Sequence, residues 1–139
     1  MGVEQEQVVL AFLECTNRRR IDVGGMVALL SDNVSYQVFV PSTPRVGREA
    51  ARAELERQDA MATGLLPGSE VRHIASNDRV VFVERVEVTE TTGIPLTLQI
   101  NGVFEVDDGE IVAWRDYYDT ADVAAQLGID VKDIVATIG

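Results

Sequence analysis

The hydrophobic pattern of the first sixty residues predicts three helices and one strand. Apolar side chains recur at helical spacing over residues 4–19 and again over residues 22–30. The stretch NVSYQVFV (33–40) has the composition of a strand, and Pro41 ends it. After the loop PSTPRVG, residues 47–61 are rich in Ala, Arg and Glu, so we expect a third helix there.

The pattern changes to that of β-strands after Pro67 and Gly68. We expect strands over residues 70–76, 79–90, 95–106 and 110–119. Short turn sequences separate these stretches, which makes consecutive strands antiparallel neighbours. Residues 120–137 are expected to form one or two closing helices, broken at Gly128. Helices followed by a strand meander indicate an α+β fold, in which a curved sheet covered by helices would leave a pocket.

Length and charge narrow the class of protein. The chain has 139 residues, so we expect a single domain over residues 1–139. Its formal net charge of −11 argues against nucleic acid and against an anionic membrane surface as partners. No apolar run approaches the ~20 residues of a membrane span, and the start lacks the basic region of a signal peptide, so we expect a cytoplasmic protein. With one His and one Cys, no metal-ligand spacing is present and no metal is expected.

Charged residues interrupt the apolar faces of two predicted strands. Side chains alternate between the two faces of a strand. One face of the strand 79–90 therefore carries Val81, Val83, Arg85 and Glu87. One face of the strand 110–119 carries Val112, Trp114, Asp116 and Tyr118.

Two interpretations of Arg85, Glu87 and Asp116 are open. If their faces line a pocket, the guanidinium bridges two buried carboxylates, and the surplus negative charge makes one carboxyl retain its proton beside an ionised partner. If their faces are solvated, the same residues form ordinary cross-strand ion pairs. Periodicity does not decide between the two, but the burial of these side chains does.

Two segments, DRVVFVERVEV (78–88) and NGVFEVDDGEIVAWRDYYD (101–119), together resemble the limonene epoxide hydrolases and the wider SnoaL-like superfamily. SYQVFVP (35–41) resembles an earlier strand of that family, so the likeness covers about residues 33 to 123. It implies a cystatin-like, SnoaL-type cone in which a curved mixed sheet and N-terminal helices close a deep pocket. It also implies a reaction without a cofactor, in which water adds to an epoxide in one step and gives a vicinal diol.

The resemblance also implies residue roles. Arg85 matches the arginine that bridges two acids, and Asp116 matches the general base. Glu87 occupies the place of the general acid, and Tyr36 matches a tyrosine that helps to hold the attacking water. The residues expected to contact substrate are Val38, Leu65, Leu66, Val83, Leu98, Ile100, Trp114 and Tyr118.

Two positions depart from the family pattern. Glu87 stands where the family has an aspartate, and its extra methylene moves the proton donor deeper into the pocket. Val38 stands where the family has an asparagine that also holds the water, and valine forms no side-chain hydrogen bond. Tyr118 and Gln99 are the residues that we expect could replace it.

The leading hypothesis is an epoxide hydrolase for a small apolar epoxide. SnoaL-like relatives also include cyclases, isomerases and binding proteins, so a polyketide or terpenoid cyclase or isomerase and a non-catalytic binder stay open. We expect a homodimer through the sheet, because the other face of the strand 79–90 is apolar and such a patch needs cover. Its residues are Val80, Phe82, Val86 and Val88.

Overall fold

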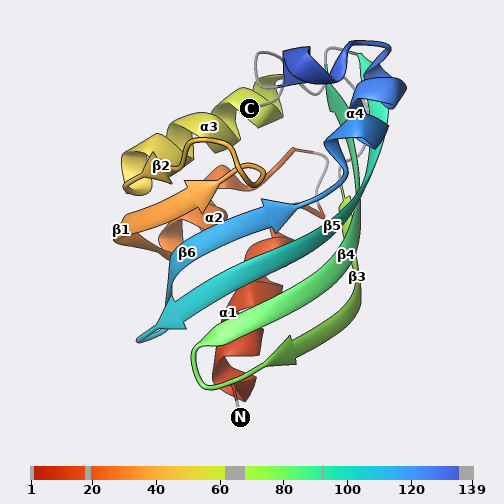
Figure 1. Cartoon of the computed structure of the whole chain (residues 1–139). Helices are drawn as coiled ribbons and strands as arrows, with labels where there is room; N and C mark the ends of the chain where they lie inside the picture. Colours follow the sequence, from red (N-terminus) through yellow and green to blue (C-terminus); the bar gives the residue numbers. More distant parts are fainter. Residues whose placement is uncertain (1, 18–19, 62–67, 92, 135–139) are drawn as a thin grey trace.

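The computed structural model describes residues 2–17, 20–61, 68–91 and 93–134, and in this part of the chain helices pack on a six-stranded sheet (Figure 1). In sheet order the strands are β2 (Arg45–Val46), β1 (Leu30–Gln37), β6 (Glu110–Tyr117), β5 (Ile94–Asp107), β4 (Val80–Thr91) and β3 (Gly68–Ser76). The helices are α1 (Val3–Glu14), α2 (Val23–Ala28), α3 (Arg48–Met61), α4 (Thr120–Leu127) and the short 3-10 helix η1 (Val131–Asp133).

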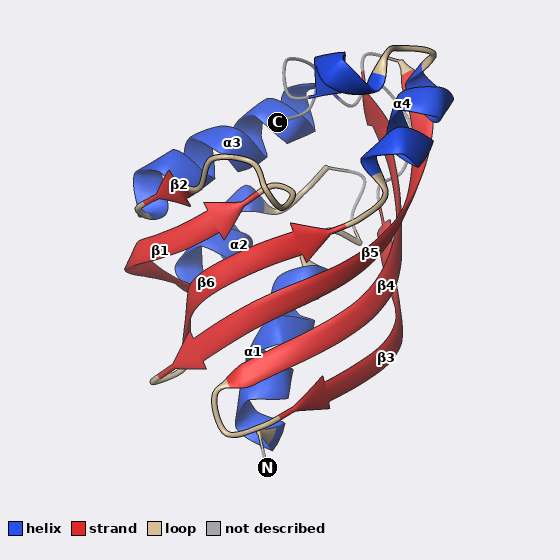
Figure 2. Cartoon of the chain, in the orientation of Figure 1, coloured by secondary structure: helices blue, strands red, loops and turns tan. Residues whose placement is uncertain are grey.

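The sheet is mixed and curved. β1 runs parallel to β6, whereas the other neighbouring strands are antiparallel. Figure 2 shows the long strands β4, β5 and β6 bending round α1, while α3 lies over the end of the sheet that β1 and β2 form. α1 contacts all four strands from β3 to β6, and α3 contacts β1 and α2. The expected α+β architecture with a curved mixed sheet is therefore confirmed.

The core lies between α1 and the concave face of the sheet. In β5 every second residue from Leu96 to Val106 is buried, because alternate positions of a strand face the same side of the sheet. Phe12 of α1 packs edge-on against Phe104 and Trp114, with ring centroids 6.0 and 4.8 Å apart. These contacts join the first helix to the last two strands.

The predicted helices and strands are present in the described residues, but several ends differ. α1 ends at Glu14 rather than at residue 19, because the chain turns there and the Thr16 hydroxyl donates to the Leu13 carbonyl at 2.6 Å. β1 begins at Leu30, three residues earlier than expected. α4 ends at Leu127, and the φ of 70° at the capping residue Gly128 confirms the predicted break. Among the described helices, none combines the length and the apolar composition of a membrane span.

A β-bulge shifts the facing of side chains at the start of β6. Glu105 and Val106 are consecutive on β5, but they pair with Ala113 and Ile111, so Val112 is passed over. Ile111 is fully buried and Val112 is half-buried. The prediction that Val112 shares the inner face with the later residues of the strand is therefore wrong, whereas the alternation holds after the bulge. β2 is a second departure, because it lies within the predicted loop.

Candidate active site

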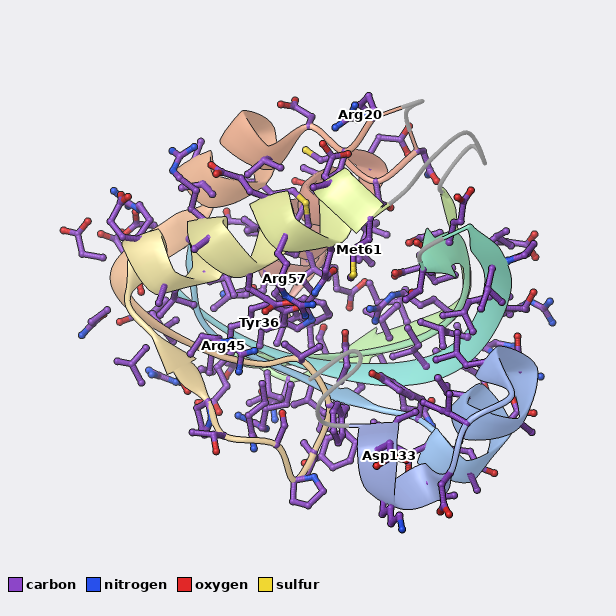
Figure 3. All side chains as sticks on the ribbon, turned by 90° about the horizontal axis from the view of Figure 1, so that it is seen from above. Arg20, Tyr36, Arg45, Arg57, Met61 and Asp133 are labelled. Carbon is purple, nitrogen blue, oxygen red and sulfur yellow. The ribbon has the colours of Figure 1, made fainter. Side chains whose placement is uncertain are left out.

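A pocket opens between the concave face of the sheet and the helices, and its walls come from α1, α2, α3 and the strands β1 and β3 to β6. It leaves about 80 Å³ for the centres of water-sized molecules, whereas one water needs roughly 10–15 Å³. Figure 3 looks down on the molecule and shows Tyr36, Arg57 and Met61 in the space between α3 and the sheet. The pocket therefore has room for a small ligand together with a water molecule.

Arg85 of β4 lies at the centre of the charged group and is only 1% exposed. Its Nη2 donates to Asp116 Oδ2 at 2.9 Å, and its Nε lies 3.5 Å from Glu87 Oε2. Burial alone would lower the pKa of Arg85, but the two carboxylates raise it above its ordinary value, so the guanidinium stays charged. Asp116 is buried as well, with 5% of its surface exposed. The interpretation of Arg85 and Asp116 as a solvated cross-strand pair is therefore wrong.

Gly102 of β5 leaves the space in which the ion pair between Arg85 and Asp116 crosses the sheet. β5 lies between β4 and β6, and Gly102 pairs with Asp116 on one side and Val83 on the other. A Cβ at Gly102 would lie 2.6 Å from Arg85 Nη1 and 3.0 Å from Asp116 Oδ1. The missing side chain is therefore what lets Arg85 reach over β5 to Asp116.

Trp114 holds the second oxygen of Asp116. Its Nε1 donates to Asp116 Oδ1 at 3.0 Å, so each oxygen of this buried carboxylate accepts a hydrogen bond. The indole stacks on the ring of Tyr36, with centroids 3.9 Å apart and planes 8° from parallel. Trp114 also lines the pocket, as predicted, and fixes both Asp116 and Tyr36 in place.

Glu87 lies at the edge of the charged group, with its side chain 24% exposed. Ser69 of β3 donates a long hydrogen bond of 3.4 Å to Glu87 Oε2, and Thr16 contacts the same serine hydroxyl at 2.9 Å. Burial raises the pKa of Glu87, and the charge of Asp116 adds to this while Arg85 opposes it. Glu87 therefore holds a proton more readily than an ordinary glutamate.

The two tyrosines expected at the site both line the pocket. Tyr36 of β1 is buried, and Gln58 Nε2 donates to its hydroxyl oxygen at 3.1 Å. Burial raises the pKa of Tyr36 well above its ordinary value, and burial raises that of Tyr118 in the same direction. Both phenols are therefore neutral hydrogen-bonding groups at physiological pH.

The remaining predicted contact residues divide into three groups. Val38, Leu98 and Ile100 line the pocket. Val83 is buried on the same face of β4 but does not line it, because it lies farther along the strand beside Gly102. Leu65 and Leu66 lie outside the described residues. Gln99 is exposed on the opposite face of β5, so the expectation that it replaces the hydrogen bond missing at Val38 is wrong.

The sequence pattern did not predict the contribution of α3. Gln58 and Met61 of this helix line the pocket, and Glu54 is buried behind them. The spacing of these residues by three or four places was the available signal, because it puts them on one face of a helix. The signal was weak because Glu54 is charged and Gln58 is polar, and such residues are usually exposed. Within the described ranges, no three His, Cys, Asp or Glu side chains are grouped as metal ligands.

Comparisons with known proteins agree with this arrangement. Residues 3–128 match the family model of the limonene-1,2-epoxide hydrolase catalytic domain. The chain is 29% identical over 130 residues to epoxide hydrolase EphG of Mycobacterium tuberculosis, which covers 94% of this chain and 81% of that protein.

Two solved structures have the same fold. The structure of a limonene epoxide hydrolase-like enzyme from M. tuberculosis is 26% identical, with a TM-score of 0.77 over 96% of both chains. SalBIII, an epoxide hydrolase/cyclase-like enzyme with a role in pyran ring formation in the polyether salinomycin, is 20% identical. Its TM-score is 0.74 over 88% of this chain and 97% of the other, a likeness of fold alone.

Proposed function

The chain belongs to the limonene-1,2-epoxide hydrolase family, and we propose that it is a cofactor-independent epoxide hydrolase that adds water to an apolar epoxide and gives a vicinal diol. The observation that carries this proposal is the buried Arg85, which lies within 2.9 Å of Asp116 and 3.5 Å of Glu87 at a pocket with mostly apolar walls. Such a group places an acid and a base at one small ligand, as epoxide opening requires.

Asp116 is the general base in this proposal. Arg85 and Trp114 each donate to one of its oxygens, so the carboxylate has a fixed orientation and keeps a lone pair on each oxygen for a further contact. A water molecule held by Asp116 and Tyr36 would lose a proton to Asp116 as its oxygen attacks an epoxide carbon. Orientation of the water supplies much of the rate, because the reactants are already in place.

Glu87 is the general acid. Its raised pKa keeps a larger share of the side chain protonated than in an exposed glutamate. As the carbon–oxygen bond breaks, the epoxide oxygen takes this proton and becomes a hydroxyl group. At the end of the reaction Asp116 has gained a proton and Glu87 has lost one, so a proton returns from Asp116 to Glu87, through solvent or a pocket water, before the next turnover.

The walls of the pocket indicate the class of substrate. Leu13, Met26, Leu98 and Ile100 line it beside the charged group. These side chains fit a hydrocarbon body, while the only groups that an epoxide needs to reach are the acid and the base. We therefore expect small alkyl- or cycloalkyl-substituted epoxides to be better substrates than charged ones.

The test is diol formation from a panel of epoxides in water enriched with heavy oxygen. The proposal predicts one labelled oxygen in each diol, and a loss of about 100-fold or more in kcat for Asp116→Asn and for Glu87→Gln. Asp122→Asn is the matched control, because this exposed acid lies on α4 and not among the residues that line the pocket. Absence of diol from every epoxide, with Asp116→Asn no different from the wild type, would refute the proposal.

Val38 favours one alternative, a cyclase or isomerase that opens an epoxide with a hydroxyl group of the same molecule. Its side chain lines the pocket but offers a water molecule no hydrogen bond. An internal nucleophile is positioned by its own chain and needs less help from the protein. A cyclic ether without heavy oxygen from a hydroxy-epoxide substrate would identify this activity, and binding of epoxides without turnover would identify a non-catalytic binder.

A further inference from the structure

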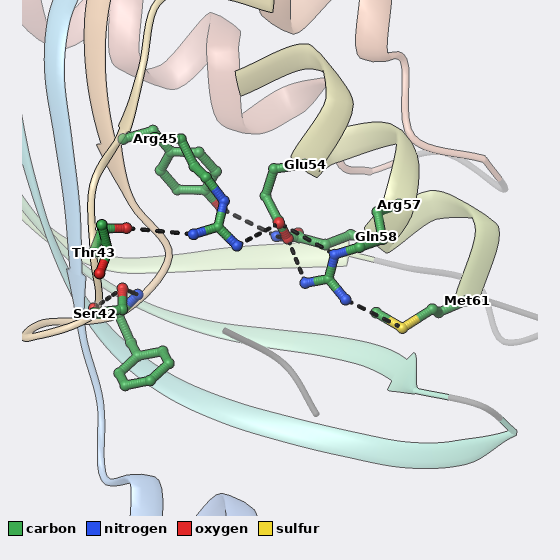
Figure 4. Close-up of polar contacts among 9 residues, drawn as sticks. Ser42, Thr43, Arg45, Glu54, Arg57, Gln58 and Met61 are labelled. Atoms are coloured by element: carbon green, nitrogen blue, oxygen red, sulfur yellow. Dashed lines mark hydrogen bonds and ion pairs between the residues drawn. The ribbon is translucent and has the colours of Figure 1, made fainter. Parts of the chain in front are cut away.

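A buried ion cluster lies behind Tyr36, on the side of α3. Glu54 is buried, and Arg45 of β2 donates to its Oε1 at 3.0 Å while Arg57 donates to its Oε2 at 2.7 Å (Figure 4). Burial by itself would raise the pKa of Glu54, but hydrogen bonds from Arg57, Gln58 and Arg45 lower it overall. Glu54 is therefore an ionised carboxylate, which accepts hydrogen bonds and donates none.

The charge of Glu54 fixes the orientation of the Gln58 amide. The two residues are one turn apart on α3, and Gln58 Nε2 lies 2.9 Å from Glu54 Oε2. A carboxylate repels the amide oxygen and attracts the amide nitrogen, so the NH₂ group must face Glu54. Its second hydrogen is directed at the Tyr36 hydroxyl oxygen, 3.1 Å away.

This hydrogen bond determines what the Tyr36 hydroxyl does. Because its oxygen accepts from Gln58, its own hydrogen must be donated to something else. The Tyr36 ring is stacked on Trp114, and Tyr36 lines the pocket, so its O–H faces the pocket. The order of donors then runs from Gln58 to Tyr36 to a group in the pocket.

We infer that Gln58, oriented by the Glu54 carboxylate, is a positioning residue that makes Tyr36 an obligatory hydrogen-bond donor to the attacking water. This inference rests on the proposed function for the identity of the acceptor. A water that accepts from Tyr36 and donates to Asp116 keeps one lone pair directed at the epoxide carbon. The amide thus orients the water from α3, whereas Val38, the residue after β1, offers the water no hydrogen bond.

The kinetic test is a double-mutant cycle of Gln58→Met, which keeps the shape but removes the amide, with Tyr36→Phe. Gln58→Met is expected to lower kcat about tenfold with little change in KM, the effect of one misdirected hydrogen bond. In the Tyr36→Phe background the same change is expected to have no further effect, because Gln58 acts only through the phenol. Independent effects that multiply in the double variant would overturn the inference.

Arg52→Gln is the matched control for changes in α3, because Arg52 forms an exposed ion pair with Glu56 at 3.8 Å and does not line the pocket. Its kcat is expected to stay unchanged. Gln58→Asn is a second, milder variant. It keeps the amide on a shorter side chain that cannot reach both partners, so kcat should fall between those of the wild type and Gln58→Met.

A spectroscopic test needs no turnover. The chain has three tyrosines, so NMR of protein labelled with ¹³C at the tyrosine Cζ gives three resonances, assignable with single Tyr→Phe variants. Gln58→Met and Gln58→Asn should shift the Tyr36 resonance and leave that of the exposed Tyr117 unchanged. An unmoved Tyr36 resonance would overturn the inference. A shifted resonance in a protein that hydrolyses no epoxide would instead support the network and refute the proposed function.

Discussion

Gly102 is the residue where a small change in volume should have the largest effect on the site. Gly102→Ala places a methyl group 2.6 Å from Arg85 Nη1 and 3.0 Å from Asp116 Oδ1, so one of the two side chains must move. Displacement of a catalytic group by about 1 Å can cost about 100-fold in rate, and overpacking costs about 1–3 kcal/mol of stability. We expect both losses, measured as kcat/KM and as the free energy of unfolding in urea.

Gly24→Ala is the matched control for that substitution. A Cβ at Gly24 meets only Asp22 Oδ1, at 3.9 Å, and the residue lies in α2. Alanine is favoured over glycine inside a helix, so stability should not fall. If Gly102→Ala behaves like Gly24→Ala, the space at Gly102 is not needed by the ion pair.

The pH dependence of the rate should report the ionisation of Glu87. Its pKa is raised by burial, and the proposed acid works only while protonated. The rate must therefore fall as the pH rises through this raised pKa, which gives kcat/KM an alkaline limb that belongs to the free enzyme. A kcat/KM that instead increases through the whole range above pH 4.5 would exclude Glu87 as the acid.

At the scale of single elements, the chain shows where periodicity succeeds and where it fails. Alternation in β4 correctly grouped Arg85 and Glu87 with buried valines, because no irregularity interrupts the pairing of that strand with β5. In β6 the bulge at Val112 changes the facing of one residue, and a bulge has no clear sequence signal here. In α3 the buried face contains Glu54 and Gln58, which a hydrophobic pattern assigns to solvent.

The ion cluster on α3 should stabilise the fold as well as orient Gln58. Glu54→Ala leaves two guanidinium groups without their shared carboxylate, but Arg45 and Arg57 are 28% and 40% exposed and can be hydrated. We therefore expect a loss of about 1–2 kcal/mol in the free energy of unfolding. Glu56→Gln, which removes an exposed acid of the same helix, should change it by less than about 0.5 kcal/mol. Equal values for the two variants would show that the cluster adds no stability.

At the scale of the whole molecule, the family resemblance predicted which strand faces are buried, whereas the residue pattern did not. Periodicity placed three charged residues on apolar faces, but only the arrangement of helices over the sheet decides which face is buried. The family likeness implied that arrangement in advance, and the described structure confirms it for Arg85 and Asp116. Neither periodicity nor the family likeness predicted the orientation of Gln58, because it depends on contacts between β2, β1 and α3 that no local pattern encodes.

Pairing of two chains through the outer face of the sheet stays a prediction, which the structure makes specific. On this face Phe82 is 51% and Val88 is 40% exposed, with the half-buried Val80 and Val86 beside them.

Phe82→Ser should convert a dimer to a monomer in sedimentation experiments, because the largest exposed apolar side chain at the contact is lost. Val46→Ser on β2 is the control, since Val46 is also apolar and exposed but lies on an edge strand, separated from β4 by three strands. The pocket opens on the concave face, so the Phe82→Ser monomer should keep its activity per chain. A wild-type protein that sediments as a monomer, or a Phe82→Ser variant that stays dimeric, would place the interface elsewhere or remove it.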